Sequence, residues 1–279
     1  MKPVVIVIVG PTASGKTKLS IELAKKIDGE IISSDSMQVY KDMNIGTAKV
    51  TEEEKCGIKH YLIDYVNPSD RYTVSDFKHD AENAIEEILS KSKTPIIVGG
   101  TGLYVNSLIY GIEYQEMNFD ETYRKELMHQ AETPEGLEKL YEEAKKIDEE
   151  AVIKISPNDK KRIIRILEIY KATGKNKTEQ EILSRKNGVK YDYKVFGINY
   201  DRQKLYERID MRVDMMIDQG LEDEVKMLLE KYTEFPTAMQ GLGYKEVVKY
   251  LKRWIFTRWN DRNNKKRIKA LCKKTNDLV

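Results

Sequence analysis

Residues 10–17, GPTASGKT, have the types and the spacing that hold linked phosphates. They match G-x-x-x-x-G-K-[ST] through Gly10, Gly15, Lys16 and Thr17, between an apolar β-branched run and a helical pattern. Backbone N–H groups and the helix N-terminus would cradle a diphosphate, Lys16 would add charge, and the Thr17 hydroxyl could bind Mg²⁺. The loop alone does not identify ATP, because any ligand with two linked phosphates fits it. The expected diphosphate contacts are Gly10, Pro11, Thr12, Ala13, Ser14, Gly15, Lys16 and Thr17.

Two other polar residues follow predicted strands, where an open α/β sheet binds its ligands. Asp35 ends the strand in GEIISSDS and could be a general base or a Mg²⁺-linked carboxylate. The alternative is a turn or helix cap in SSDS. Thr101, in GGTGLY, could place a hydroxyl in the same crevice, although the glycines could equally mark a tight turn.

Two pairs of arginines occur at helical spacing. Arg162 and Arg165 are three residues apart, and Arg208 and Arg212 are four apart, so each pair shares a helix face. A solvated charged face is the ordinary explanation for such pairs. Arginine is also the preferred fork for phosphate, so both pairs are candidate anion contacts.

The elements that must position these residues alternate between buried strands and amphipathic helices over residues 4–105. This alternation predicts an α/β fold: a P-loop NTPase-like parallel sheet flanked by helices. Residues 115–194 are rich in Glu and Lys and predict an inserted helical domain. The segment 193–201 then returns as a strand. The predicted division is a core of 1–114 and 195–252, an insertion of 115–194 and a separate basic tail of 253–279.

Composition limits the function classes. The chain has 279 residues, is 40% hydrophobic and carries a formal net charge of +2. No apolar run approaches the roughly 20 residues of a membrane span, and the apolar start is expected to be a core strand rather than a signal peptide. The two cysteines form no metal-ligand spacing or disulfide framework, so a cytoplasmic location is expected.

The motifs together resemble one family, the bacterial tRNA dimethylallyltransferases, also called tRNA isopentenyltransferases. The matching segments are GPTASGKT, DSMQVYKDMNIGTAK, HYLID, VGGTGLY, NDKKRIIRILEIY, ERIDMRVDMMIDQGLEDEV and QGLGYKEV, in family order between residue 4 and about residue 252. The resemblance implies that the loop holds dimethylallyl diphosphate. It further implies transfer of the allyl group to the exocyclic amine of the adenosine 3′ of the anticodon, with release of diphosphate.

The resemblance also assigns roles to residues. It makes Asp35 the general base, Thr101 its neighbour, and Arg212 a stabiliser of the departing diphosphate beside Lys16 and a Mg²⁺ ion on Thr17. The target base must be extruded from the anticodon loop, and the helical insertion would grip the anticodon stem-loop. A monomer without membrane association is expected. The tRNA contacts implied are Asp35, Ser36, Met37, Gln38, Thr101, Arg124, Arg162, Arg165, Gln240, Tyr244 and Lys245.

The tail departs from the family. Residues 253–279 hold nine Lys or Arg and two Asp or Glu, a charge of +7 that leaves −5 for the remainder. With suitable synonymous codons, LCKKTNDLV read one base later gives YAKRQMTW, which is close to a family motif. We therefore expect a change of reading frame near residues 252–253, so that the tail's charge is no indication of RNA binding. The alternative is a divergent basic tail.

Two other function classes remain open at this level. A small-molecule kinase could use the same loop for ATP, although neither an arginine-rich lid nor a nucleobase pocket can be identified. An RNA-binding module without catalytic activity would bind the stem-loop but show no turnover.

Overall fold

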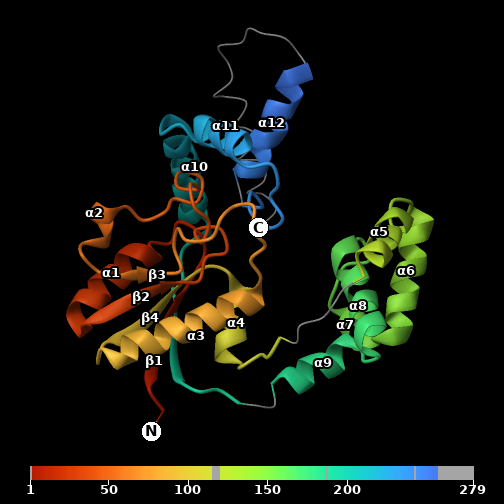
Figure 1. Cartoon of the computed structure of the whole chain (residues 1–279), viewed down its shortest axis with the longest axis horizontal. Coiled ribbons are helices and arrows are strands. Elements are labelled where there is room, and N and C mark those ends of the chain that lie inside the picture. The colour runs from red at the N-terminus through yellow and green to blue at the C-terminus, as the bar shows by residue number, and fades with distance from the viewer. Residues whose placement is uncertain (1, 115–119, 186–187, 242, 257–279) are drawn as a thin grey trace. The chain divides into compact units, whose positions relative to one another are not determined.

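The computed structural model describes residues 2–114, 120–185, 188–241 and 243–256, with side chains described as far as Leu251. Contacts divide the chain into two compact units, shown with their elements in Figure 1. The α/β unit comprises Met1–Ile109 and Lys190–Val279, and the helical unit comprises Tyr110–Val189. Both divisions fall five residues before the predicted boundaries at 114 and 194.

A five-stranded parallel sheet forms the centre of the α/β unit, in the order β3-β2-β4-β1-β5. Its strands are β1 (Val4–Val9), β2 (Gly29–Ser33), β3 (His60–Tyr61), β4 (Thr94–Gly99) and β5 (Asp192–Gly197). The prediction of a parallel sheet flanked by helices is confirmed. The third strand, β3, is short because Leu62 and Asp64 have φ values of 59° and 61°, outside the extended region.

Apolar side chains on alternate strand positions bury the two faces of this sheet under different helices. Ile31 and Ile96 belong to a cluster with Ile21 of α1 (Lys16–Ile27). The next residues along the strands, Ile32 and Ile97, pack with α3 (Val74–Ser90) instead. The sheet is therefore covered on both sides, and its ligand-binding edge is where the strands end.

The remaining helices of the α/β unit are α2 (Glu52–Lys55), α4 (Gly102–Ile109), α10 (Arg202–Asp218), α11 (Leu221–Lys231) and α12 (Tyr244–Phe256). Gly220 has a φ of 99° and separates α10 from α11. The last helix passes the predicted frame change at 252–253, and the rest of the tail, 257–279, lies outside the described residues.

The helical unit contains α5 (Glu121–Gln130), α6 (Pro134–Ile147), α7 (Glu149–Ile153), α8 (Lys160–Thr173) and α9 (Lys177–Ser184). Asp159 caps α8 at its start, and Gly174, at a φ of 67°, follows its end. Leu140, Val152 and Ile163 are fully buried in the core of this unit. Within the described residues of both units, no helix has the length and apolarity needed to cross a membrane.

Candidate active site

The phosphate loop connects the end of β1 to the start of α1. Ala13 and Gly15 have φ values of 63° and 88°, which turn the chain tightly into the helix. No side chain caps the N-terminus of α1, so its first N–H groups are available to an anion. The Ser14 hydroxyl is buried and has no hydrogen-bond partner among the described residues. A buried hydroxyl without a partner is costly, so this atom also favours a polar ligand in the loop.

Lys16 is folded over the loop. Its Nζ donates to the carbonyl oxygens of Gly10 at 2.8 Å and Pro11 at 2.7 Å. Burial lowers the pKa of Lys16; the charge of Asp35 opposes this shift and that of Arg212 adds to it. Lys16, Asp35 and Arg212 are thus close enough to influence one another, and the cation here has lost part of its hydration.

Asp35 follows β2 and shapes a turn, as the alternative interpretation of SSDS predicted. Its Oδ1 accepts the N–H groups of Met37 at 2.8 Å and Gln38 at 3.2 Å. Its Oδ2 accepts no hydrogen bond from the described residues, so one oxygen remains available for a proton. Thr101, just before α4, accepts the N–H of Ser36 at 3.1 Å. The turn function and a catalytic function are therefore compatible in one carboxylate.

Arg212 reaches the same site from α10. Its Nη2 donates to the Thr47 carbonyl oxygen at 3.0 Å. Burial lowers the pKa of Arg212, and the nearby charge of Asp35 opposes that shift. A guanidinium held partly out of water next to a phosphate loop is suited to bind a compact anion.

Arg208 has a contact that the sequence did not predict. Its Nε donates to the Ala13 carbonyl oxygen at 2.7 Å, and its Nη1 donates to the Tyr200 hydroxyl at 3.0 Å. Arg208 therefore holds the phosphate loop at the Ala13 carbonyl. The signal for it was its spacing of one helical turn from Arg212.

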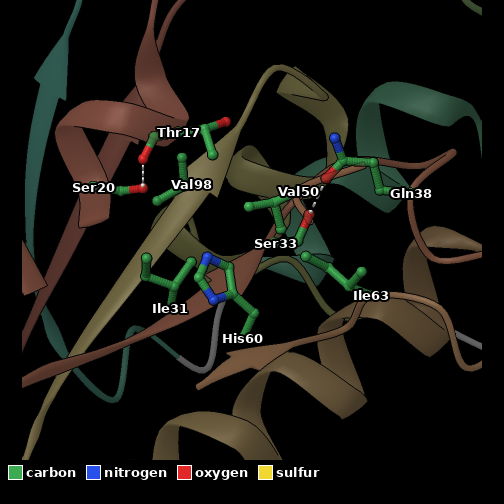
Figure 2. Close-up of a pocket in the computed structure, with 9 residues that line it drawn as sticks. All are labelled: Thr17, Ser20, Ile31, Ser33, Gln38, Val50, His60, Ile63 and Val98. Atoms are coloured by element: carbon green, nitrogen blue, oxygen red, sulfur yellow. Dashed lines mark hydrogen bonds between the residues drawn. The ribbon is translucent and has the colours of Figure 1, made fainter. Parts of the chain in front are cut away.

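A small pocket lies between α1 and the sheet, shown in Figure 2. Its volume is about 30 Å³, which suits a water molecule but not a nucleobase. His60 lines it, with Nδ1 on the Ile58 carbonyl at 2.9 Å and a buried Nε2 that lacks a partner among the described residues. Burial lowers the pKa of His60, which favours the neutral ring. The lining residues are Thr17, Ser20, Ile31, Ser33, Gln38, Val50, His60, Ile63 and Val98.

The predicted RNA contacts in the α/β unit fall into two groups. Ser36, Met37 and Gln38 lie in the Asp35 turn and are partly exposed, and Gln240 and Lys245 are exposed. Tyr244 differs, because it is 0% exposed and its hydroxyl donates to Glu224 at 2.6 Å. The expectation that Tyr244 contacts RNA is therefore corrected: in this structure it is a core residue.

The predicted RNA contacts in the helical unit are three arginines, each of which pairs with an acidic side chain. Arg124 donates to both carboxylate oxygens of the buried Glu168, at 3.0 and 3.1 Å, and Arg165 lies 3.8 Å from the same carboxylate. Arg162 pairs with Asp159 at 3.2 Å. These pairings orient the guanidinium groups while each side chain keeps a large exposed surface.

A metal site built from protein side chains alone is not found within the described residues, since no three His, Cys, Asp or Glu gather suitably. The exposed Thr17 at the start of α1 still offers a hydroxyl oxygen. Mg²⁺ is commonly held by few protein oxygens together with substrate phosphates, so this donor set fits such a binding mode.

Comparisons with known proteins agree on one family. The family described as IPP transferase matches residues 38–278. A tRNA dimethylallyltransferase of Acetivibrio thermocellus is 53% identical over 249 residues, covering 89% of this chain and 79% of that protein. The crystal structure of a tRNA isopentenylpyrophosphate transferase from Bacillus halodurans has a TM-score of 0.67 at 38% identity, covering 100% of this chain and 85% of that one. A eukaryotic dimethylallyltransferase described as acting on tRNA has a TM-score of 0.73 at 33% identity, covering 99% of this chain and 68% of that one.

Proposed function

The chain belongs to the IPP transferase family, and from this premise we propose that it uses dimethylallyl diphosphate as the donor in modifying tRNA. The enzyme transfers a dimethylallyl group to an adenosine of tRNA. We place the acceptor at the exocyclic amine of the adenosine 3′ of the anticodon. The observation that carries this proposal is the grouping of Lys16, Asp35 and Arg212 around the phosphate loop.

The donor half of the reaction breaks the bond between the allylic carbon and the diphosphate oxygen. The carbon tolerates developing positive charge through delocalisation, so the main demand is to stabilise the charge that grows on the leaving diphosphate. Fixed N–H groups of the loop, the Lys16 ammonium and the Arg212 guanidinium meet that demand without reorganising.

The acceptor half forms the carbon–nitrogen bond, and the amine must lose one proton as it attacks. Asp35 has an oxygen available for this proton while its other oxygen holds the turn through Met37 and Gln38. Thr101 keeps that turn in place through the Ser36 N–H. The carboxylate is thus oriented by the backbone and protonated as the product forms.

We assign Mg²⁺ as the cofactor, held by the Thr17 hydroxyl together with diphosphate oxygens. When bound, it would neutralise part of the diphosphate charge and assist its departure. The chain's contribution is to present Thr17 at the uncapped start of α1, beside the N–H groups that take the remaining oxygens.

For the tRNA, we propose that the anticodon stem-loop contacts both units. Arg124, Arg162 and Arg165 would take phosphates, and Gln240 and Lys245 would contribute exposed polar contacts. The target base would be extruded from the loop to reach Asp35. A monomeric state and a cytoplasmic location remain predictions.

A transfer assay tests this function. Purified protein with Mg²⁺ and an unmodified anticodon stem-loop should add one dimethylallyl group per RNA when given dimethylallyl diphosphate, detected by mass spectrometry of the nucleosides. ATP should give no phosphorylated product and should compete weakly. Tight ATP–Mg²⁺ binding in calorimetry without allyl transfer would instead support the kinase class, and RNA binding without turnover would support the inactive module.

A further inference from the structure

Glu224, near the start of α11, is a buried carboxylate that the reaction described above does not use. It is 8% exposed. Within the described part of the chain, no lysine or arginine lies within ion-pair distance of it. Its Oε2 accepts the backbone N–H groups of Asn44 at 2.9 Å and Ile45 at 2.7 Å, and its Oε1 accepts that of Gly46 at 3.1 Å. One side chain therefore holds three consecutive N–H groups that lie about 180 positions away in sequence.

The loop that Glu224 binds leads directly to the proposed site. The next residue, Thr47, accepts Arg212 Nη2 at 3.0 Å and Gln38 Nε2 at 3.2 Å through its carbonyl oxygen. Gln38 in turn donates its N–H to Asp35 Oδ1 at 3.2 Å. A single peptide carbonyl thus connects the guanidinium expected to bind diphosphate with the turn that carries the expected base.

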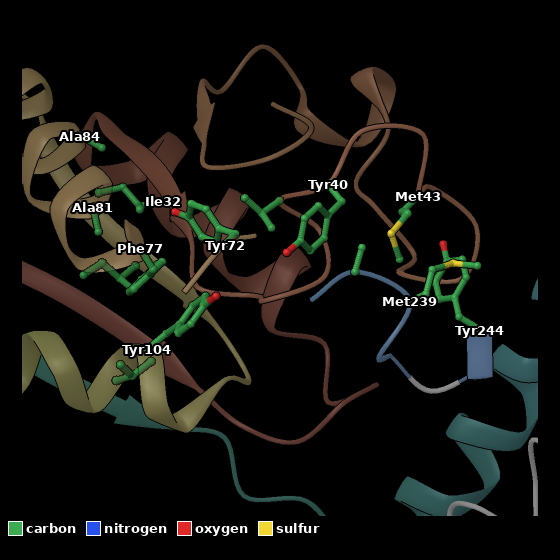
Figure 3. Packing of buried hydrophobic residues seen from close by; sticks show 14 of the residues in the cluster. Ile32, Tyr40, Met43, Tyr72, Phe77, Ala81, Ala84, Tyr104, Met239 and Tyr244 are labelled. Carbon is green, nitrogen blue, oxygen red and sulfur yellow. The ribbon is translucent and has the colours of Figure 1, made fainter. Parts of the chain in front are cut away.

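Tyr244, a member of the buried cluster drawn in Figure 3, also contacts Glu224 and the loop. Its hydroxyl donates to Glu224 Oε1 at 2.6 Å, and its ring packs on the loop at Gly46. A Cβ atom at position 46 would lie 2.5 Å from a Tyr244 ring carbon and 2.9 Å from Leu221 Cδ1. Since real Cβ atoms do not approach so closely, the loop fits against Tyr244 only with glycine at this position.

We propose that Glu224 is a positioning residue for the transfer reaction: it fixes residues 44–46 so that the Thr47 carbonyl holds Arg212 in place. This inference rests on the proposed function. Three N–H groups and a hydroxyl stabilise the buried carboxylate directly, and the Lys49 ammonium acts on it electrostatically from beyond ion-pair distance. No cation has to be shared between Glu224 and the diphosphate, so the support should remain unchanged when the substrate binds.

Glu224→Gln tests the proposal, because the amide keeps the size of the side chain but places an NH₂ group against N–H donors. We expect kcat to fall by about 10- to 100-fold, the scale for a small misplacement of reacting groups. KM for tRNA should change by less than about threefold. The control is Glu30→Gln. Glu30 is another buried carboxylate that accepts a tyrosine hydroxyl, that of Tyr61 at 2.8 Å, and it lies at the start of β2, the end away from Asp35. The melting temperature of this control should fall while kcat stays near that of the wild type.

A double-mutant cycle separates positioning from general destabilisation. If Glu224 acts through Arg212, then Glu224→Gln in an Arg212→Ala background should lower kcat by less than about threefold, because the aimed group is already absent. Equal fold-losses in both backgrounds would overturn the proposal, as would a folded Glu224→Gln enzyme with the kcat of the wild type.

Should Glu224→Gln fail to fold, Gly46→Ala and Tyr244→Phe perturb the same loop from its other face. Gly46→Ala should lose kcat in the same non-additive way, and Tyr244→Phe should lose less because the three N–H groups remain. A soluble Gly46→Ala protein with unchanged kcat would also overturn the proposal. Absence of transfer by the wild type would count against the proposed function itself, whereas these outcomes, measured on an active wild type, count against Glu224 alone.

Discussion

The cations of the two units differ in their exposure to water. In the α/β unit, burial is the largest influence on Lys16 and Arg212 and lowers the pKa of both. In the helical unit, the side chains of Arg124, Arg162 and Arg165 are 46%, 71% and 44% exposed. Lys16 and Arg212 lie near the phosphate loop. The three arginines of the helical unit lie at its surface, where they pair with Glu168 and Asp159.

This difference suits two kinds of anion. A compact diphosphate concentrates charge, and cations that have already lost hydration bind it strongly with little screening by salt. The phosphates of an RNA backbone are spaced along a strand, and exposed arginines bind them one at a time. Added salt weakens the affinity that such contacts give. We therefore expect substitutions of cations in the α/β unit to slow the chemical step. Substitutions of arginines in the helical unit should instead weaken RNA binding in a way that depends on salt.

The largest effect is expected from removing the charge of Asp35, the anion near the half-buried cations Lys16 and Arg212. Asp35→Asn should lower the single-turnover rate by about 10²- to 10⁴-fold, the usual scale for loss of a general base. Binding of dimethylallyl diphosphate should be nearly intact, because the loop and both cations remain. The rate should be measured by rapid quench with enzyme in excess, and an unchanged rate would remove Asp35 from the role of base.

Arg212→Ala should have the next largest effect. Removing one fixed donor to a developing anion typically costs about 10²- to 10³-fold in kcat. The tRNA affinity should change little, since Arg212 is half-buried in the α/β unit and is expected to bind the diphosphate. Arg212→Lys keeps the charge but not the fork, so it should recover part of the rate.

The control for this variant is Arg208→Ala, measured with the same RNA. Arg208 fixes the loop through the Ala13 carbonyl, so its loss should weaken diphosphate binding more than it slows the chemical step. If Arg212→Ala instead reduces tRNA affinity alone, Arg212 belongs with the RNA contacts and the comparison between the units fails.

Local patterns predicted the parts of the site that are adjacent in sequence. The phosphate loop could be recognised because its spacing is a continuous code, and Asp35 because it ends a buried strand. Glu224 could not be predicted, since its partners at 44–46 meet it only after the chain has folded. The same limit explains Tyr244, whose motif suggested contact with RNA while its burial depends on the packing around Gly46. The frame change proposed for the tail stays a prediction that the coding DNA will decide.

The helical unit should respond more weakly and through affinity. Arg165→Ala should weaken stem-loop binding by about threefold to tenfold and reduce the salt slope of log K by about 1, as for the loss of one phosphate contact. Single-turnover rates at saturating RNA should stay within about twofold of the wild type. Fluorescence anisotropy from 50 to 300 mM salt measures this, and Glu168→Gln is the companion variant, because it frees the arginines without removing them. A rate defect that persists at saturating RNA would contradict the division of roles.

The smallest effect concerns the stability of the ligand-free protein. Lys16 has a folded-state pKa below its unfolded value near 10.5, so below both values the folded state bears the free-energy cost of burying the charge. As pH rises through the folded pKa toward 10.5, the folded protein releases this proton before the unfolded chain does, and the stability of the wild type increases. Lys16→Met removes the burial cost. The carbonyls of Gly10 and Pro11 lose a donor but lie where water can reach the loop.

We therefore expect the ligand-free Lys16→Met protein to be more stable than the wild type at pH 7, by a few tenths to about 1 kcal/mol, the usual gain from relaxing a functional site. The advantage should shrink as pH rises toward 10. Pyrophosphate should raise the melting temperature of the wild type by more than that of the variant, since the variant lacks one of the two cations expected to bind it. Thermal unfolding from pH 7 to pH 10, with and without pyrophosphate, measures both effects. A variant that is less stable at pH 7 would show that the two hydrogen bonds of Lys16 stabilise the folded state by more than its desolvation destabilises it. Lys16 would then contribute to the stability of the α/β unit, and the expectation that it lowers stability in favour of binding would be wrong.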